Sequence, residues 1–324
     1  MRITNVEGLH LRLPRTKATT DGPQDALLVR ISTDAGVTGW GEVDASPYVA
    51  KAVIDAPPSH TLANGLRTLL IGEDPLDTDR LWSRMYEGTL YYGRDGVVIP
   101  AMAGVDLALW DIKGKAAGEP VHRLLNGGYR TSVRAYAASP FAPTPAATAE
   151  RARAARDAGY TAVEFGWEPF GEDPDQDCAF LEAIRRAIGE DMELMVDAGH
   201  AWDARTTLER ARLFDPYHLF WIEEPLHPDD LDGYAVVSHE CEIPIAAGEE
   251  ECTVAGLNRL MEIGRVDLLQ VDPSRVGLTQ AMTVAMLAQS SGVPIVSHGF
   301  TTGVNAAASL HLLTASHRRS AATR

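Results

Sequence analysis

The strongest constraint on the fold is a series of short apolar segments between residues 192 and 298, each of which ends in an ionisable side chain. The terminal residues are Asp197, Glu223, Glu249, Asp272 and His298, and they are spaced by 26, 26, 23 and 26 residues. One strand, one helix and two short loops occupy a span of this length. Because the apolar segments show little alternation, they are typical of strands that are covered on both faces. The series therefore predicts successive βα units of one parallel sheet.

The same alternation extends over residues 132–315. We expect strands at SVRAYAA, TAVEFGW, MELMVDAG, HLFWIEE, IPIAAGE, VDLLQVD and PIVSHG, and helices at residues 144–158, 173–188, 203–214, 229–238, 253–263, 278–290 and 304–315. No Gly-rich dinucleotide fingerprint is found, which favours a (β/α) barrel over a doubly wound sheet. The usual barrel has eight strands, whereas HRRSAATR follows the seventh unit without an apolar segment. We therefore expect an α/β modified TIM barrel of the (β/α)7β type that lacks its eighth strand.

The first 130 residues are expected to form a separate α+β unit. Strands are predicted at residues 3–13 and 26–32, with a hairpin turn near residues 34–36, and helices at residues 61–70, 75–87 and 97–117. The predicted domains are thus an N-terminal capping domain at residues 1–130 and a C-terminally truncated barrel domain at residues 131–324. Asp106, Asp111 and Lys113 in the last helix have the spacing of helix-surface ion pairs, and we interpret them as structural.

Charge and cysteine content restrict the partners and the compartment. The formal net charge is −16 and no basic stripe balances it, so we expect neither a nucleic-acid partner nor an anionic membrane surface. The three cysteines are an odd number without metal-ligand spacing, which suits a reducing cytosol. No signal peptide and no transmembrane segment are expected, so we predict a cytoplasmic protein.

Three of the terminal acids predict a metal site. If the sheet closes toward a barrel, Asp197, Glu223 and Glu249 meet at the rim where the strands end. Uncompensated carboxylates there would raise one another's pKa, and a cation removes that penalty. Oxygen ligands without Cys or His suit Mg²⁺, with Mn²⁺ as the second choice. The alternative is that acids at these positions cap the following helices, and we prefer it for Asp203, Glu250 and Glu251. Glu224, next to Glu223, is expected to face the other way or to lie in the loop.

The last two terminal residues predict a base. A carboxylate bonded to one ring nitrogen fixes the histidine tautomer and leaves the other nitrogen free to accept a proton. Asp272 and His298 lie one repeat apart, on neighbouring predicted strands. We therefore expect an Asp–His pair opposite the acids. The alternative is a histidine with a structural role.

The motifs WIEEP, IAAGE, VDP and VSHG, with VRISTDAGVTGWGE and DLALWDIKGKAAGEP upstream, resemble the enolase superfamily, and within it the mandelate racemase and acid-sugar dehydratase subgroup. The resemblance covers nearly the whole chain. It implies a capping domain over a modified barrel, one Mg²⁺, and abstraction of the proton next to a substrate carboxylate. It also implies that Asp197, Glu223 and Glu249 bind the metal and that Asp272 and His298 form the base dyad. An enolate-type reaction needs such a cation because the proton is weakly acidic until the developing charge is neutralised.

Two departures from the family pattern shape the expected reaction. Racemizing relatives carry a Lys-x-Lys pair at the end of the second strand, where this chain has Glu164, Phe165 and Gly166. A two-base racemase or epimerase is thereby disfavoured but stays an alternative. Dehydration of a sugar acid, an aldonate or aldarate, to a 2-keto-3-deoxy acid is preferred. The second departure is the missing eighth strand, which raises the alternative of a truncated, non-catalytic remnant.

The remaining candidates assist this reaction. Protonated His298 or His200 would give a proton to the leaving hydroxyl, although His200 equally suits a polar role at the rim. Glu164 would either contact a substrate hydroxyl or form an ion pair. Two predicted cap loops, residues 14–25 and 46–58, offer Arg15, Lys17 and Tyr48 as contacts to a small carboxylate substrate, although exposed basic loop residues are commonly just solvated. The family resemblance also implies a homo-oligomer, a dimer or an octamer.

Overall fold

The structure is a computed structural model and describes residues 1–16, 23–126 and 130–316. Its contacts divide the chain into two compact units. The first contains residues 1–133, 251–258 and 270–323, and the second contains residues 134–250 and 259–269. The domain boundary expected between residues 130 and 131 stays a prediction.

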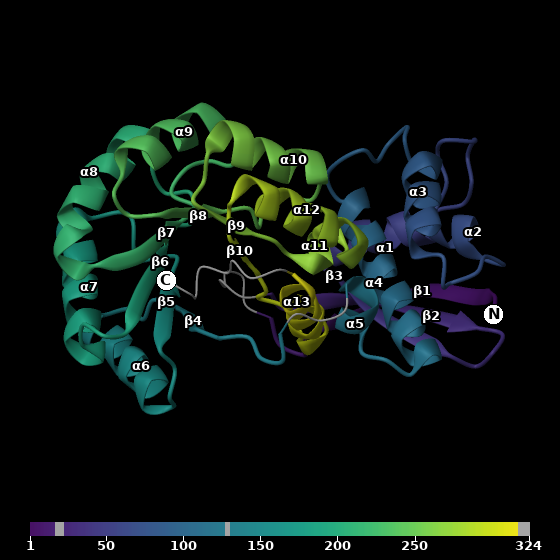
Figure 1. The fold of residues 1–324 in the computed structure, drawn as a ribbon, viewed down its shortest axis with the longest axis horizontal. Helices are drawn as coiled ribbons and strands as arrows, with labels where there is room; N and C mark the ends of the chain where they lie inside the picture. Colours follow the sequence, from purple (N-terminus) through teal and green to yellow (C-terminus); the bar gives the residue numbers. More distant parts are fainter. Residues whose placement is uncertain (17–22, 127–129, 317–324) are drawn as a thin grey trace. The chain divides into compact units, whose positions relative to one another are not determined.

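An antiparallel sheet forms the N-terminal part of the first unit (Figure 1). Its strands, in spatial order, are β1 (Ile3–Arg12), β2 (Asp25–Thr33) and β3 (Thr38–Val43). The predicted hairpin is confirmed, because β2 pairs with β3 up to Ser32 and Thr38, and Gly36 in the turn has a φ of +77° that suits glycine. The inner face of β2 buries residues in alternation, as a half-buried strand requires.

Helix α4 (Val98–Ala117) lies directly against β3. A side-chain carbon added at Gly41 would lie 1.9 Å from the carbonyl oxygen of Gly104, and one at Gly39 would lie 2.0 Å from that of Ala108. Glycine at these positions therefore allows the strand and helix backbones to touch. The helix ends where predicted, at Gly118 in the left-handed conformation. The contact fixes the end of β3, which carries residues described below.

Short helices and one strand complete the first unit. They are α1 (Pro47–Asp55), α2 (Leu66–Leu70), α3 (Thr78–Gly88), α5 (Val121–Asn126), α11 (Pro273–Val276), α12 (Leu278–Ser291), β10 (Ile295–Val296) and α13 (Gly303–Ala315). The helix expected at residues 61–70 is wrong over its first half. The side-chain amide of Asn64 donates hydrogen bonds to the carbonyl oxygens of His60 and Thr61. The backbone at Gly65 lies so close to Ala56 that a side-chain carbon added to the glycine would be 2.0 Å from the Ala56 carbonyl oxygen. These local bonds replace the helical ones.

The three charged residues of α4 are structural, as expected, but their partners differ from the expected ones. Asp111 forms the predicted kind of ion pair with Lys115 at 2.7 Å, and Lys113 lies over the Trp110 ring. Asp106 is fully buried, so it does not form the surface ion pair that was expected. It accepts hydrogen bonds from the backbone N–H of Thr279 at 2.9 Å and the hydroxyl of Thr279 at 2.6 Å, at the start of α12. Its carboxylate therefore satisfies an unpaired donor of the first helical turn.

Parallel strands form the second unit, and β10 follows them in a seven-stranded sheet that keeps the order of the chain. The strands are β4 (Ala137–Pro140), β5 (Ala162–Gly166), β6 (Glu193–Asp197), β7 (Leu219–Glu223), β8 (Ile245–Ala247) and β9 (Leu268–Gln270). The predicted fold class, an α/β fold with a parallel sheet and an N-terminal antiparallel sheet, is confirmed. Within the residues that the structure describes, no eighth parallel strand follows β10. Strand β4 begins about five residues later than expected.

Helices alternate with these strands. They are α6 (Pro145–Asp157), α7 (Pro174–Ile188), α8 (Ala204–Phe214), α9 (Leu231–Glu240) and α10 (Val254–Arg259), with single turns at Asp215–Tyr217 and Leu260–Gly264. Figure 1 shows α6 to α9 along one side of β5, β6 and β7. Asp173, Asp203 and Asp230 each accept a backbone N–H at the start of the following helix, as the capping interpretation of Asp203 predicted.

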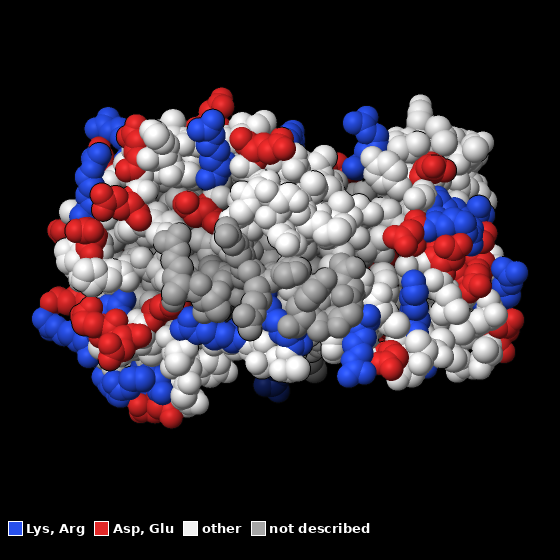
Figure 2. All heavy atoms as spheres, in the orientation of Figure 1, with Lys and Arg blue, Asp and Glu red and all other residues white. Residues whose placement is uncertain are grey.

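Acidic and basic side chains are interspersed on the face shown in Figure 2. Some ion pairs join neighbours on one helix, such as Arg205 and Glu209 of α8, which lie 2.9 Å apart. Among the described residues, no helix has both the length and the apolar character needed to cross a bilayer.

Candidate active site

Asp197 and Glu223 end neighbouring parallel strands in register. Asp197 is the last residue of β6 and pairs with Glu223, the last residue of β7. Paired residues of parallel strands point to the same face of the sheet, and the strands lie about 4.8 Å apart. Glu249 follows β8 by two residues, after Gly248, whose φ of +138° is open to glycine alone. The three acids that were expected to bind a metal therefore arise from three consecutive strand ends of the second unit.

The electrostatics around Glu223 fit a cation. Its pKa is raised well above the usual range, first by burial and then by the neighbouring carboxylates of Glu164, Asp197 and Glu249. Its Oε2 atom is buried and has no hydrogen-bond partner. A buried acceptor without a donor, among carboxylates that repel one another, is the arrangement that a hard cation with oxygen ligands stabilises. The donor set thus fits Mg²⁺.

Glu164 in β5 faces the same acids. Trp221 donates a hydrogen bond from Nε1 to its Oε2 at 3.1 Å. Burial, and then the charge of Asp197, raises the pKa of Glu164 to about 8. The neighbours that the structure gives to this side chain are an indole and further carboxyl groups, so the ion-pair alternative finds no support here.

Gly166, at the end of β5, gives room to Asp197. A side-chain carbon at Gly166 would lie 2.8 Å from Cβ of Asp197 and 2.9 Å from its Oδ2. A lysine at this position would require the Asp197 side chain to move. Of the two positions where racemizing relatives carry lysines, the first is Glu164 in this chain. The second is Gly166, and the Asp197 side chain occupies the space that a side chain at this position would need.

Asp272 and His298 form a hydrogen-bonded pair in the first unit. Oδ2 of Asp272 lies 2.7 Å from Nδ1 of His298. The other oxygen, Oδ1, accepts hydrogen bonds from the backbone N–H and the hydroxyl of Ser274, at 2.7 and 2.6 Å. Asp272 therefore has both roles that were considered for such acids, because it caps the short helix α11 and also bonds His298. When Nδ1 donates its proton to this carboxylate, the lone pair of the neutral ring lies on Nε2 of His298.

A third residue, Asn305 of α13, holds the same carboxylate. Its Nδ2 donates to Oδ2 of Asp272 at 3.2 Å, and its backbone N–H donates to Glu42 of β3 at 3.0 Å. Glu42 is fully buried and also accepts a hydrogen bond from the hydroxyl of Thr302 at 2.7 Å. Our sequence reasoning did not identify Glu42 or Asn305, because each belongs to a pattern that is typical of an ordinary strand or helix.

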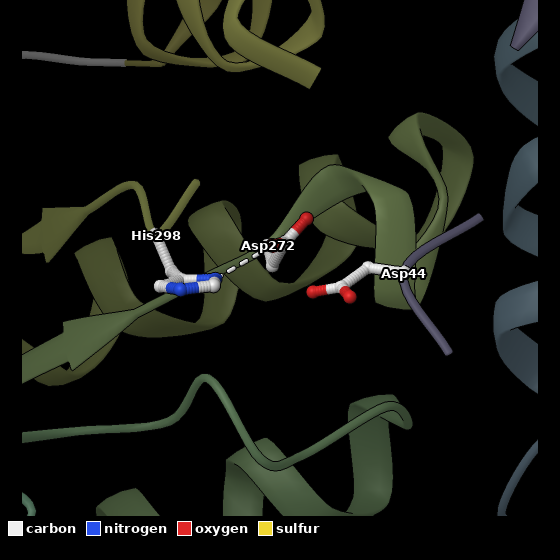
Figure 3. Close-up of side chains that lie close together, drawn as sticks. All are labelled: Asp44, Asp272 and His298. Atoms are coloured by element: carbon white, nitrogen blue, oxygen red, sulfur yellow. Dashed lines mark hydrogen bonds and ion pairs between the residues drawn. The ribbon is translucent and has the colours of Figure 1, made fainter. Parts of the chain in front are cut away.

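Asp44 is a further residue that sequence reasoning missed. It follows β3, and ligand atoms of Asp44, Asp272 and His298 all lie within 4.8 Å of one another (Figure 3). Burial, and then the charge of Asp272, raises the pKa of Asp44. The signal that identified the other acids, an ionisable residue after an apolar strand, is present here too. It was applied only to the repeating part of the chain.

His200 lies three residues beyond Asp197 and has a left-handed backbone, with a φ of +62°. Its Nε2 lies 2.6 Å from Oε2 of Glu224, and a carboxylate oxygen of Glu250 is within 4.8 Å of both side chains. The hydrogen bond with Glu224 is the largest cause of a raised pKa at His200. Glu224 follows β7 with a φ of +37°, so it lies outside the strand, as expected. This histidine is therefore predisposed to carry a proton.

The three candidates in the predicted cap loops are less well defined, and the loop expected at residues 46–58 is wrong over most of its length, because Pro47–Asp55 form helix α1. Arg15 is exposed. Tyr48 lies in α1, its side chain is largely exposed, and its ring packs edge to face against His10 with the centroids 4.5 Å apart. Lys17 lies outside the described residues. Their predicted role in substrate binding stays a prediction.

A cavity of about 330 Å³ lies at the other end of the strands of the second unit. It is lined by residues that precede or begin β6, β7 and β8, such as Met192, Leu219 and Ile243. None of the predicted site residues lines it. Because barrel enzymes keep their chemistry at the carboxyl ends of the strands, this cavity does not identify the active site.

Comparisons with known proteins bear on this arrangement. Residues 3–126 match the N-terminal domain of the mandelate racemase / muconate lactonizing enzyme family, and residues 147–323 match the family described as enolase C-terminal domain-like. The D-galactarolactone cycloisomerase of Agrobacterium fabrum is 34% identical over 298 residues, which covers 89% of this chain and 75% of that protein. The arabinonate dehydratase of Saccharolobus solfataricus is 31% identical, with coverage of 92% and 79%.

Solved structures agree with the fold. The crystal structure of the 3,6-anhydro-D-galactonate cycloisomerase from Zobellia galactanivorans superposes with a TM-score of 0.88 at 32% identity, over 99% of this chain and 86% of that one. A racemase from Streptomyces coelicolor with bound magnesium superposes with a TM-score of 0.87 at 30% identity, over 98% and 88%.

Proposed function

Because the chain belongs to the mandelate racemase and muconate lactonizing enzyme family of the enolase superfamily, we propose that it is an acid-sugar dehydratase that abstracts the proton next to a carboxylate. The substrate is an aldonate or an aldarate, and the product is the 2-keto-3-deoxy acid. The observation that carries the proposal is the 2.7 Å bond between Asp272 and His298, because it leaves Nε2 of the histidine as a base.

The reaction removes water from the substrate. Nε2 of His298 takes the C2 proton, the C3–O bond breaks, and the C3 hydroxyl leaves with one proton as water. The resulting enol rearranges to the 2-keto acid. Asp272 stabilises the imidazolium that forms, and Asn305 and Ser274 hold the Asp272 carboxylate in place. Protonated His298, or His200 with its partner Glu224, gives the proton to the leaving hydroxyl.

The proposed reaction requires a divalent cation. Asp197, Glu223 and Glu249 would hold Mg²⁺, with Mn²⁺ as the alternative, and the ion would supply positive charge to the substrate carboxylate as negative charge develops there. Glu164, which accepts a hydrogen bond from the Trp221 indole, would contact a substrate hydroxyl through its carboxyl group. Arg15, Lys17 and Tyr48 stay candidates for contact with the rest of the substrate.

A panel of aldonates and aldarates tests the function. The formation of 2-keto-3-deoxy acids, measured as their semicarbazones, is expected for at least one member in the presence of Mg²⁺. The His298→Asn variant is the control, and it is expected to be inactive while keeping its thermal stability. Full activity in this variant, or no product from any sugar acid, would reject the proposal.

Cycloisomerisation is the second candidate. It is supported by the 34% identity to a D-galactarolactone cycloisomerase. Racemization is disfavoured, because Glu164 and Gly166 occupy the two positions of the lysine pair of racemizing relatives. Turnover in D₂O separates the possibilities. Deuterium that enters recovered substrate at C2, with no loss of water, would indicate racemization or epimerization, whereas consumption of a lactone without a dehydrated product from the free acid would indicate cycloisomerisation.

A further inference from the structure

The segment after β3 adds a second carboxylate beside the Asp272–His298 pair. An oxygen of Asp44 lies within 4.8 Å of ligand atoms on both residues, and Figure 3 shows the Asp44 carboxylate turned toward them. The proposed reaction gives no role to this side chain. We propose that Asp44 determines specificity, because it accepts a hydrogen bond from a hydroxyl of a monocarboxylic sugar acid and repels the second carboxylate of a dicarboxylic one. The inference rests on the proposed function, since it assumes that the reacting carbon lies at His298.

The position of Asp44 is fixed by the residues that fix the dyad. Its backbone N–H donates to the carbonyl oxygen of Ser274 at 3.3 Å, and Ser274 in turn donates twice to Asp272. Nη1 of Arg275 approaches the carbonyl oxygen of Asp44 at 3.5 Å. Strand β3, which precedes Asp44, lies against α4 through its glycines. These contacts fix the backbone of Asp44 relative to Asp272, and its carboxylate extends from that backbone to within 4.8 Å of the dyad.

The local charge disfavours a second anion. The groups that act on Asp44 are the carboxylates of Asp272 and Glu42, which raise its pKa, and the cations Arg275 and His298, which lower it. Asp272 has to be ionised in order to hold protonated His298, so at least one negative charge is already present. An ionised carboxylate only accepts hydrogen bonds. A substrate hydroxyl can donate a hydrogen bond to the Asp44 carboxylate. A second substrate carboxylate at about 4 Å would instead be repelled by this like charge, because the position is partly buried.

Matched pairs of acids test the inference by binding as well as by turnover. Threonate and tartrate of matching configuration differ only in the last carbon, which is a hydroxymethyl group in one and a carboxylate in the other. Their affinities for the Mg²⁺-loaded protein are measured by titration calorimetry. We expect threonate to bind at least tenfold more tightly than tartrate, and we expect Asp44→Asn to reduce this ratio at least fivefold, mainly by improving tartrate binding.

The same comparison is made for kcat/KM with an aldonate and the aldarate of equal hydroxyl configuration. Asp44→Ser provides a second neutral variant in case the Asn variant folds poorly, and Asp191→Asn, on an exposed loop of the other unit, is the matched control with an unchanged ratio. Turnover of sugar acids with a ratio that both Asp44 variants leave unchanged overturns the inference alone, as does tighter binding of tartrate. No turnover of any sugar acid, together with a binding ratio that Asp44→Asn does reduce, overturns the proposed function while the discrimination by Asp44 stands.

Discussion

Asp272 bonds His298 with one carboxylate oxygen and caps helix α11 with the other. The bond to Nδ1 of His298 is 2.7 Å long, and the two bonds from Ser274 are 2.7 and 2.6 Å long. The proposed base is thus oriented by a residue that is itself part of a helix start. We therefore expect any change that moves α11 to move His298 as well.

Replacement of Asp272 by Asn is expected to lower kcat by about 10²- to 10⁴-fold, because an amide cannot stabilise the imidazolium and favours the wrong tautomer. The amide oxygen still caps α11, so the melting temperature is expected to change little. Steady-state kinetics and thermal denaturation of the same preparation check both parts. A variant with near wild-type kcat would contradict the role of the dyad.

Replacement of Asn305 by Ala removes the donor to Oδ2 of Asp272 and leaves a buried acceptor with one bond fewer. We expect a loss of about 1–3 kcal/mol in the free energy of unfolding and a decrease in kcat with little change in KM. Urea denaturation and kinetics measure the two effects. Ser309→Ala is the control, since its hydroxyl donates to Oδ1 of Asn305 at 3.3 Å, and its removal leaves the donor from Asn305 to Asp272 in place. An equal loss of kcat in both variants would argue against positioning by Asn305.

Mg²⁺ is expected to raise the melting temperature in a saturable way, because a ligand that binds only the folded state stabilises it. Glu223→Gln should abolish the increase. Binding should also release protons, since Glu164 and Glu223 have raised pKa values and a cation favours their ionised forms. Calorimetry in buffers of different ionisation enthalpy measures this release. A Mg²⁺ response that persists in Glu223→Gln would place the ion elsewhere.

Asp106 predicts a specific dependence of stability on pH. Burial raises its pKa to about 7 in the folded protein, compared with 3.8 for the free side chain. The folded state therefore holds more protons than the unfolded state between these values, so this residue makes the protein less stable as the pH rises from about 4 to 7. The contribution is on the order of 4 kcal/mol.

Asp106→Asn is expected to remove that contribution, because an amide remains neutral and can still accept from the Thr279 N–H. The free energy of unfolding, measured by urea denaturation at several pH values, should therefore fall less steeply with rising pH in the variant. Glu87→Gln, on the surface of α3, is the control for the loss of one formal charge. Parallel curves for wild type and Asp106→Asn would contradict the expected titration.

His200 predicts a shift in the pH profile. Its hydrogen bond with Glu224 raises its pKa, so a role as general acid requires activity to fall as the pH rises through that raised value. Glu224→Gln removes the charge and should move the basic limb of kcat to lower pH. Titration of the ring proton by NMR identifies the group. An unchanged limb would assign the proton donor to His298.

The recurrence of apolar segments predicted most of the parallel sheet. A strand that is buried on both faces is apolar along its whole length, so each strand can be identified from its own residues alone. It could not predict that Gly65 passes close to Ala56, nor that Asn64 would bond neighbouring carbonyls, and so the helix expected at residues 61–70 was wrong in its first half. Local periodicity carries no information on which backbones will approach each other.

The same limit applies to the site. The bond between Asp272 and His298 has a signal in the sequence, since both residues end segments of one repeat. Glu42 and Asn305 have none that distinguishes them from ordinary strand and helix residues, whereas Asp44 follows an apolar strand outside the repeating part of the chain, where the signal was not applied. They become recognisable once the fold brings β3, α11 and α13 together, because a buried carboxylate is informative only when its neighbours are known.

The buried side chain of Glu42 has a consequence for engineering. Glu42 belongs to the N-terminal sheet, but its carboxylate accepts hydrogen bonds from Thr302 and Asn305 at the start of α13. Asn305 in turn donates a hydrogen bond to the Asp272 carboxylate. A chimaera that exchanges the N-terminal sheet with that of a relative would therefore alter the support of the Asp272–His298 pair as well as the sheet itself. Grafting a new cap onto this protein should retain the residue at position 42, or replace it together with its partners on the last helix.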